Sequence, residues 1–361
     1  MLVVNAGSSS LKLSVLDEED RLIISENVSS TAGRLDEERL LHVVRRGDPI
    51  DAVGHRVVHG GTEFVESVAV DAAVVRRLHA LSDLAPLQQP KSLAALEAVT
   101  RLLPQVPAVA CFDTAFHARM SPAASTYALP AEWRKRWALR RFGFHGLSHA
   151  YASQRAADLG GRASEGFRVV TCHLGAGASL AAVASGRSVD TTMGFTPLEG
   201  LVMATRSGSV DPGLVLWLEE HMGMPSSELA ATLEHRSGLL GLTGSADMKA
   251  ILEAEAAGDA DAALGVAVYV HRVRAGIAAM AAAMGGLDAL VFTGGVGERA
   301  PSIRARSVAE LGFLGVTLDG SANETPELDA EIGAADVPVR TFVVEAREDL
   351  QIARDVRAVL G

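Results

Sequence analysis

A short polar turn occurs twice in this chain, and it constrains the fold more than any other feature of the sequence. The first copy, Asn5 to Lys12, reads Asn-Ala-Gly-Ser-Ser-Ser-Leu-Lys, and the second, His173 to Leu180, reads His-Leu-Gly-Ala-Gly-Ala-Ser-Leu. Each copy lies between apolar runs typical of strands, and its glycines let the backbone turn and approach a ligand closely. Exposed N–H groups and hydroxyls in such turns form a cradle for an anion. Two phosphate-sized cradles therefore predict two similar domains that face one nucleotide.

The composition limits the class of protein and its partners. With 361 residues, 48% of them hydrophobic, the chain can bury two ordinary cores. Its net charge of −11 repels nucleic acid and anionic lipid, so we expect neither partner and arginines that act locally. The beginning of the chain lacks a leader pattern and no later uncharged run is long enough to span a membrane, which predicts a cytoplasmic protein. Cys111 and Cys172 end apolar runs without a Cys-x-x-Cys partner and are interpreted as core thiols.

The first part of the chain alternates strand-like and helix-like patterns. Apolar residues at 11, 13 and 15 alternate with polar ones, as in a half-buried strand that places Lys12 just beyond the turn. Residues 17–50 are charged and helix-permissive, and residues 70–101 indicate a helix, a loop and a second helix. A helix-like run at 147–159 leads into a strand-like run at 167–172, where the pattern restarts. This predicts a domain boundary near residues 146–150.

The last part of the chain repeats the alternation. An Ala-rich, nearly uncharged helix over 262–284 ends at Gly285 and Gly286, and its all-round apolarity predicts burial. A buried strand at 287–292 then feeds the Gly-rich turn 293–298, which suits the rim of a nucleotide site at the start of a helix. A strand at 339–344 and a helix at 349–360 follow. Repeated β and α patterns predict an α/β fold.

Eight short blocks along the chain resemble signatures of the acetate kinase family. One Gly-rich match would be weak evidence, whereas eight in the same order are specific. The blocks are Asn5–Lys12, His55–Gly61, Phe112–His117, Gly143–Gly146, His173–Gly186, Pro197–Gly200, Thr205–Gly208 and Phe292–Glu298.

This resemblance implies a fold, an activity and partners. The fold is α/β, with duplicated actin-like (ribonuclease H-like) domains flanking a nucleotide cleft. An N-terminal acyl- and phosphate-binding domain would comprise residues 1–147 plus 348–361, and a C-terminal nucleotide-binding domain residues 148–347. The activity is reversible transfer of a phosphoryl group between ATP and acetate, giving acetyl phosphate and ADP. The family also implies Mg²⁺ (or Mn²⁺), a small carboxylate and a nucleotide as partners, and a homodimer.

Phosphoryl transfer to a carboxylate requires positioning and neutralisation of charge rather than a strong base, because the acceptor is already ionised at pH 7. Arg56 and Arg206 lie in short polar blocks beside Gly and His, and a guanidinium can hold a trigonal anion with paired hydrogen bonds. A surface ion pair is the alternative for each; the family places transition-state arginines in both blocks. His145 could donate to the same oxygens or be structural.

Asp113 and Glu348 are the candidates for the metal side of the site, since Mg²⁺ takes oxygen ligands and keeps several waters. Glu348 opens the last helix, where the family has its metal-binding carboxylate, although an acidic residue there can also be a helix-dipole partner. Asn5 would join Glu348 at the metal. By the resemblance, nucleotide and phosphate are bound by Asn5, Ser8, Ser10, Lys12, His173, Gly175, Gly177, Asp247, Met248, Lys249, Gly294, Gly295 and Gly297.

The family's small acyl pocket is apolar, and the matching positions here are Val58, Leu87, Phe144 and Pro197. That supports acetate or propionate as the acceptor.

Four positions depart from the family pattern. Gln88 replaces a His near the catalytic site, Ala176 an Asn in the second turn, Lys249 an Arg on the adenosine side, and Arg347 an Asn before Glu348. Gln donates hydrogen bonds without carrying charge, and Lys lacks a planar stacking surface. These changes bear on efficiency and on nucleotide or acyl choice.

Three other functions remain open. A kinase of the same family could prefer propionate or another short-chain carboxylate. A nucleotide-operated actin-like binding protein would turn over ATP slowly without depending on a carboxylate, since fold alone does not fix function. A degenerate, inactive member is the third, because of Gln88 and Ala176.

Overall fold

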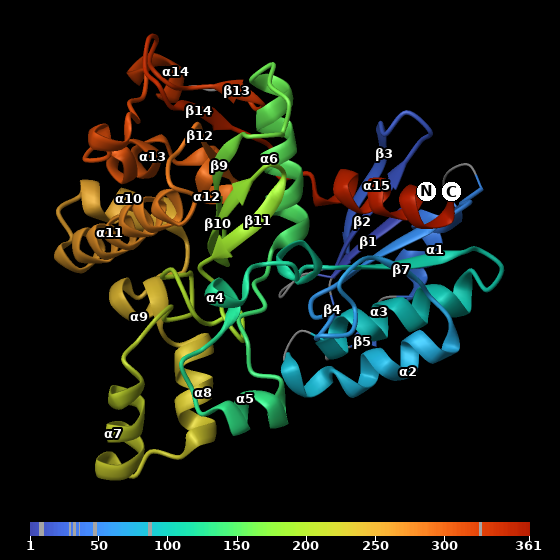
Figure 1. The fold of residues 1–361 in the computed structure, drawn as a ribbon. Coiled ribbons are helices and arrows are strands. Elements are labelled where there is room, and N and C mark those ends of the chain that lie inside the picture. The colour runs from blue at the N-terminus through green and yellow to red at the C-terminus, as the bar shows by residue number, and fades with distance from the viewer. Residues whose placement is uncertain are drawn as a thin grey trace. The chain divides into compact units, whose positions relative to one another are not determined.

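The structure is a computed structural model in which the chain forms two compact units. The first unit comprises Met1–Arg119, Phe144–Tyr151 and Arg347–Gly361, and the second comprises Met120–Gly143 and Ala152–Ala346. Figure 1 shows the elements of both, coloured along the chain. The described residues are 1–6, 11–28, 30–31, 34–35, 37–45, 49–85, 89–324 and 327–361.

The first unit is built on a six-stranded sheet in the order β3-β2-β1-β6-β8-β7. Strands β2 and β3 continue antiparallel from β1, whereas β6 and β8 run parallel to it and β7 closes the other edge antiparallel to β8. Its strands are β1 (Leu2–Ala6), β2 (Leu11–Leu16), β3 (Leu22–Val28), β6 (Val53–Val57), β7 (Val68–Ala69) and β8 (Ala108–Phe112), and a separate small ribbon pairs β4 (Ser30–Thr31) with β5 (Arg34–Leu35).

The second unit repeats this sheet in the order β11-β10-β9-β12-β14-β13. Again a hairpin and a third antiparallel strand flank the central strand, two parallel strands follow, and a short antiparallel strand ends the sheet. Its strands are β9 (Arg168–Leu174), β10 (Ala178–Ala184), β11 (Arg187–Thr191), β12 (Ala289–Thr293), β13 (Ala330–Glu331) and β14 (Arg340–Val343). The duplication extends to the sixth strand and confirms the predicted α/β fold of two actin-like units.

Helices cover both faces of the first sheet. Leu2 and Val4 point to the face covered by α1 and α3, whereas Val3, between them, packs with Ile352 and Val356 of the last helix on the opposite face. Alternate residues of β1 are thus buried on different sides, as expected for a strand covered on both faces. The unit's helices are α1 (Glu37–Arg45), α2 (Ala72–Ala80), η1 (Ser82–Leu84), α3 (Gln89–Leu102), η2 (Ala115–His117) and α15 (Glu348–Leu360), and α6 (Gly146–Leu159) begins here and ends in the second unit.

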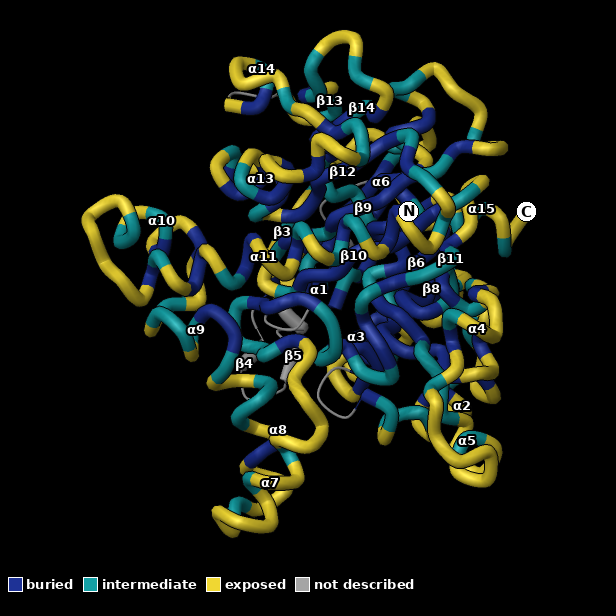
Figure 2. Tube along the Cα trace, turned by 60° about the vertical axis from the view of Figure 1, so that its left-hand side comes forward, coloured by how far each residue is buried: buried dark blue, intermediate teal, exposed yellow. Residues whose placement is uncertain are grey.

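The second unit has its own set of helices, of which α11 (Ala260–Ala283) is the longest described. Figure 2 shows buried strands surrounded by more exposed helices. The others are α4 (Pro122–Ser125), α5 (Ala131–Trp137), α7 (Pro212–Met222), α8 (Ser226–His235), α9 (Gly238–Thr243), α10 (Met248–Ala256), α12 (Gly294–Arg299), α13 (Pro301–Val308), η3 (Gly312–Leu314) and α14 (Gly320–Glu324).

Helix α11 is less buried than its sequence predicted. One face packs on β9 and β10, with Val266, Val273 and Ile277 inaccessible to solvent, but Leu264 on another face is 54% exposed. Within the described ranges, α11 is the one helix long and apolar enough to cross a membrane by length and composition. The helix contains Asp261, Arg272 and Arg274, so it is not the uncharged run that the sequence was expected to lack. Its packing on the sheet is that of a core helix in a globular unit.

Most predicted elements are present, including the helix–loop–helix at 70–101, the helix at 147–159 and the strand before the second turn. The prediction for residues 17–50 was incomplete, because Leu22–Val28 forms β3 before α1. Only one residue of β3 is buried, so its exposed apolar and charged side chains hide the alternation that would reveal a strand.

The segment Met120–Gly143 belongs to the second unit, whereas the sequence analysis assigned it to the first domain. Arg141 explains the difference: its guanidinium donates to the carbonyl oxygens of Thr191, Thr192 and Met193 and pairs with Glu199 at 2.5 Å. These contacts tie the segment to the loop after β11, which no local pattern around residue 141 could indicate.

Candidate active site

In the first unit, Arg56 lies at the centre of a buried polar cluster. Its Nε and Nη2 donate to the Asp113 carboxylate, with Nη2 to Oδ2 at 2.6 Å, and its Nη1 donates to Oδ1 of Asn5 at 3.0 Å. The amide of Asn5 in turn donates to Oε2 of Glu348 at 2.5 Å. Four residues that the sequence singled out, from positions as distant as 5 and 348, therefore form one hydrogen-bonded chain.

Sheet topology brings this cluster together. Asn5 lies near the end of β1, Arg56 near the end of β6, and Asp113 directly follows β8. These three strands are parallel neighbours, so their carboxyl ends meet at one edge of the sheet. Ligand sites of parallel α/β sheets form at this edge. Glu348 joins them from the first turn of α15.

The electrostatics of the cluster keep Arg56 charged. The side chains of Arg56 and Asp113 are only 12% and 2% exposed. Burial alone would lower the pKa of the Arg56 guanidinium, but the carboxylates of Asp113 and Glu348 outweigh burial and raise that pKa. Burial raises the pKa of the Asp113 carboxyl, and contact with Arg56 opposes that effect. The site thus holds a permanent cation whose position is fixed by neighbouring oxygens.

Asp113, predicted as a catalytic residue and as a candidate for the metal side of the site, is engaged by hydrogen bonds from two residues. Both of its oxygens accept hydrogen bonds from Arg56, and the carboxylate also accepts one from the backbone N–H of His145. A carboxylate engaged in this way is a poor metal ligand and a good counter-charge. These contacts favour a counter-charge that positions Arg56 and the start of α6, and the catalytic and metal roles of Asp113 stay predictions.

His145 adopts a left-handed backbone conformation, with φ of 56°, directly before α6. Its carbonyl accepts the N–H of His149, and the following Gly146 donates its own N–H to the carbonyl oxygen of Asp113 at 2.9 Å. A Cβ atom at Gly146 would lie 2.2 Å from that same oxygen, so only glycine allows this approach. His145 is therefore held in an uncommon backbone conformation beside the cluster, and its role at the phosphoryl oxygens stays a prediction.

Other predicted residues of the first unit lie around the cluster. Lys12 is half-buried and pairs across the hairpin with Asn5. Val58 and Phe144 are 7% and 1% exposed, and the Phe144 ring contacts the ring of His59 at 5.4 Å between centroids. Four further predicted positions, Ser8, Ser10, Leu87 and Gln88, lie outside the described residues.

In the second unit, Arg206 lies in a loop and is largely shielded from solvent, with 13% of its side chain exposed. Its Nη1 donates to the carbonyl oxygen of Pro197 at 2.7 Å, and its Nε lies 3.9 Å from Oε2 of Glu234. Burial lowers the pKa of Arg206, and Glu234 opposes this. The structure thus joins two predicted residues, Arg206 and Pro197, directly.

A cavity of about 650 Å³ in the second unit is lined by the two Gly-rich turns predicted to bind nucleotide. Gly175 and Ala176 come from the hairpin turn between β9 and β10, and Gly295 and Val296 come from the start of α12. The block Asp247-Met248-Lys249 at the start of α10 forms another wall. Three groups of predicted residues therefore surround one cavity large enough for a nucleoside.

The geometry of the Gly-rich turn at the start of α12 depends on Gly294. Its φ is 78°, and a Cβ atom there would lie 2.8 Å from the carbonyl oxygen of Leu174. Because β12 runs parallel to β9, Thr293 is paired with His173 and the two turns emerge side by side. Gly177 and Gly297 support these turns without lining the cavity.

Two departures noted in the sequence, Ala176 and Lys249, both line this cavity. Lys249 lies 3.9 Å from Glu253, one helical turn later. Tyr269 and Arg299 also line the cavity and were not predicted from the sequence. Arg299 could have been suspected because it follows the Gly-rich turn closely, whereas Tyr269 lies within an apolar helix and gave no such signal.

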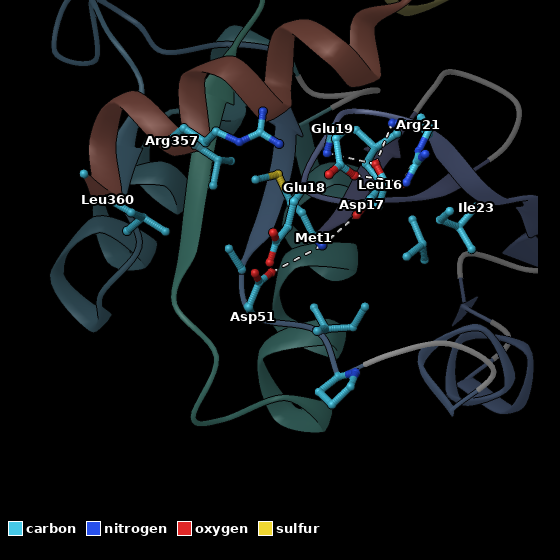
Figure 3. A pocket seen from close by; sticks show the side chains of 16 residues that line it. Met1, Leu16, Asp17, Glu18, Glu19, Arg21, Ile23, Asp51, Arg357 and Leu360 are labelled. Atoms are coloured by element: carbon cyan, nitrogen blue, oxygen red, sulfur yellow. Dashed lines mark hydrogen bonds and ion pairs between the residues drawn. The ribbon is translucent and has the colours of Figure 1, made fainter.

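A second cavity, of about 680 Å³, lies at the opposite end of the first unit's β1–β2 hairpin from Asn5 (Figure 3). Asp17, Glu18, Glu19 and Asp51 give it an acidic wall, and Arg21 and Arg357 are the basic residues that line it. It contains none of the predicted site residues. This cavity is therefore no part of the candidate active site.

The sequence matches the acetokinase family over residues 25–354. The chain belongs to that family. An acetate kinase of Pseudothermotoga lettingae is 40% identical over 394 aligned residues, covering 100% of this chain and 97% of the relative. An acetate kinase of Gloeobacter violaceus is 48% identical over 330 residues, covering 89% of this chain and 81% of the relative.

Two solved structures are similar along their whole length. The crystal structure of Porphyromonas gingivalis acetate kinase has a TM-score of 0.92 and 34% identity, covering 100% of this chain and 99% of that one. A propionate kinase from Francisella tularensis has a TM-score of 0.93 and 34% identity, with 99% of both chains covered. Both units of this chain therefore have counterparts in carboxylate kinases of known structure.

Proposed function

We propose that this member of the acetokinase family transfers a phosphoryl group reversibly between ATP and acetate. The observation that carries the proposal is the buried Arg56, fixed by Asp113 and Asn5 at the ligand edge of the first sheet. A guanidinium held in this way is a preorganised donor for an anion, and the resemblance of the family's blocks supports a phosphoryl group as that anion.

The proposed mechanism depends on positioning and charge. Acetate is ionised at neutral pH, so its oxygen attacks phosphorus without a general base. Arg56 and Arg206 would donate hydrogen bonds to the equatorial oxygens of the transferring group, where negative charge is spread in the transition state. His145 would donate to the same oxygens. Asp113 acts indirectly, because it holds the Arg56 guanidinium in one orientation.

Asn5 and Glu348 would hold Mg²⁺, or Mn²⁺, together with water and substrate phosphates. In the part of the chain that the structure describes, no group of three His, Cys, Asp or Glu residues could form a complete metal cage. The amide of Asn5 and the carboxylate of Glu348 fit a hard cation that takes one or two protein oxygens and keeps its waters. When bound, such a cation neutralises phosphate charge; Lys12, paired with Asn5, would add a second positive charge.

The cavity of the second unit would take the adenosine of ATP or ADP. Its walls are largely apolar, with Ala176, Met248 and Val296 among them, and its polar residues are few. A planar base suits such walls, and the start of α12 provides backbone N–H groups for a phosphate. His173, Gly175, Gly177, Gly294, Gly295 and Gly297 would form the two phosphate turns.

The acyl group would contact Val58 and Phe144 from the first unit, together with Leu87 and Pro197. The burial of Val58 and Phe144 supports an apolar acceptor with a short chain. The likeness to a propionate kinase makes propionate the second candidate. Activity with ATP and acetate, propionate or butyrate, measured by trapping the acyl phosphate with hydroxylamine, tests both. A profile that peaks at propionate would replace acetate, and turnover of ATP without any carboxylate would refute the proposal.

We also propose that the enzyme is a cytoplasmic homodimer that associates through α7. This helix has no buried residue, and Leu214, Leu216, Trp217 and Met222 are between 48% and 63% exposed. Leu214, Trp217 and Met222 share one side of α7, and exposed apolar side chains gathered in this way commonly mediate association. Sedimentation of the Trp217→Ser variant tests it: a shift towards monomer is expected, and unchanged association would exclude α7.

A further inference from the structure

Helix α5 carries a compact surface of cations and tryptophans. Its sequence runs Trp133, Arg134, Lys135, Arg136, Trp137, and we call these five residues the basic–aromatic patch. Trp133 and Trp137 are 48% and 50% exposed, and six of the seven residues of α5 are exposed (Figure 2). Three adjacent positive charges are unusual in a chain whose net charge is −11.

The three cations of the patch have no ion pair with any described carboxylate, whereas many other arginines of the second unit do. Arg168 and Arg340, for example, pair with Asp288 and Glu331 at 2.8 and 2.6 Å. Within α5 itself, Glu132 is the sole acidic residue. The patch therefore presents positive charge that the rest of the described structure leaves without a neutralising carboxylate.

The two tryptophans form a ridge between the cations. Trp133 and Trp137 are four residues apart on the helix and therefore share a face, and their rings meet edge to face at 5.9 Å. The helical period places Arg134 and Arg136 on either side of that face and Lys135 on the opposite side of the helix. The guanidinium of Arg136 lies over the Trp137 ring at 5.1 Å. Aromatic rings flanked by cations are the composition of an amphipathic surface that lies in a lipid headgroup layer.

Two other partners fit the patch less well. Single-stranded nucleic acid requires open aromatic faces for stacking, but Arg136 covers Trp137 and the two rings contact each other. A second copy of the chain, docked patch to patch, would bring like charges together across the symmetry axis. The overall charge of −11 does not prevent local attraction, because exposed charges farther away than about 8 Å are screened at physiological salt.

We propose that the basic–aromatic patch docks the enzyme reversibly onto an anionic phospholipid surface. Arg134 and Arg136 would contact lipid phosphates and carboxylates beside the tryptophan ridge, which would enter the headgroup layer, and Lys135 on the far side of the helix would add to the attraction at a distance. This site is independent of the proposed kinase reaction. A basic residue near an anionic surface contributes about 1 kcal/mol, or roughly a fivefold change in partition, so removing the two arginines beside the ridge should weaken binding roughly 25-fold, and removing Lys135 as well should weaken it further.

The test uses the full chain and flotation with vesicles of phosphatidylcholine alone or mixed with phosphatidylserine. We expect the wild type to float only with the mixed vesicles and to be released by salt. The triple variant R134Q/K135Q/R136Q and the double variant W133A/W137A should both lose binding. Tryptophan emission should shift to shorter wavelength on binding in a W217F background, which leaves only the two patch tryptophans.

Matched controls separate the patch from charge in general. R76Q/R162Q/R187Q removes three exposed arginines elsewhere, and F313A removes an exposed aromatic ring; both should bind like the wild type. Circular dichroism confirms that each variant is folded. The proposal fails if the wild type ignores anionic vesicles, if the control triple variant loses as much binding as the patch variant, or if single-stranded RNA displaces the vesicles. It also fails if sedimentation shows that patch variants change the oligomeric state without lipid, which would assign the surface to a second copy.

Discussion

Replacement of Asp113 by Asn should destabilise the first unit strongly, because it leaves the buried Arg56 guanidinium without its carboxylate. The pair is almost inaccessible to solvent, so water cannot compensate for the lost charge. Breaking a buried ion pair from one side costs about 3–5 kcal/mol. For a unit of this size, each kcal/mol lowers Tm by about 2–4 °C, so the expected loss is about 6–20 °C.

A matched control exists in the second unit. Asp288 accepts hydrogen bonds from the Nε and Nη2 atoms of Arg168, at 3.0 and 2.8 Å, in the same two-pronged arrangement. These side chains are 27% and 35% exposed, and an ion pair of that exposure contributes about 1 kcal/mol or less. Asp288→Asn should therefore change Tm by only a few degrees.

Urea unfolding and calorimetry of both variants provide the measurement. We expect Asp113→Asn to lower the free energy of unfolding several times more than Asp288→Asn does. The Asp113→Asn protein should also lose turnover, because its Arg56 is no longer oriented. Combining Arg56→Met with Asp113→Leu should recover most of the stability, because an apolar pair can replace a buried ion pair, while activity stays absent. Equal effects of Asp113→Asn and Asp288→Asn would refute the role assigned to burial.

Three further predictions follow from the site and the core. Arg206→Lys should lower kcat by about 10²–10³, nearly as much as Arg206→Ala, since a point charge cannot reproduce a planar donor; a Lys variant with most of the activity would reduce Arg206 to a counter-charge. Burial lowers the pKa of His55 to about 3 and those of His59 and His117 to about 4, so the folded chain keeps them neutral while the unfolded chain takes up protons below about pH 6.5. Stability should thus be full above pH 6.5 and fall below it, with a limiting slope of about 1.4 kcal/mol per pH unit for each histidine, and urea midpoints that stay constant from pH 7 to 5 would contradict this. Gly294→Ala should weaken ADP binding measured by calorimetry, because its φ of 78° and the nearby Leu174 carbonyl oxygen exclude a Cβ atom; unchanged affinity would separate this turn from the nucleotide site.

The sequence predicted the parts of the site that depend on short motifs. The polar turns contain Asn5 and His173, and the short block at 55–61 contains Arg56, so a local pattern was enough to single them out. Parallel strands then bring Asn5 and Arg56 to the same sheet edge, an arrangement that alternating β and α segments already imply. Glu348 lies far from Asn5 and Arg56 in the sequence, and only the resemblance to the family predicted that it joins them at the site.

The rest depends on tertiary contacts that no local pattern encodes. Asp113 looked like a metal ligand because a carboxylate after a strand suits either role, and only its contacts with Arg56 and His145 decide between them. Residues 120–143 were assigned to the wrong unit because Arg141 meets its partners some 50 residues later. Strand β3 was missed because tertiary pairing with β2, rather than burial, defines it.

ATP formation from ADP and acetyl phosphate by the purified chain, measured with and without a divalent metal, tests the proposed phosphoryl transfer. We expect rapid ATP formation that requires the metal, saturates with acetyl phosphate and falls by at least about 10²-fold in Arg206→Ala. ATP formation that persists in excess chelator, or hydrolysis of ATP with no dependence on any carboxylate or acyl phosphate, would contradict it.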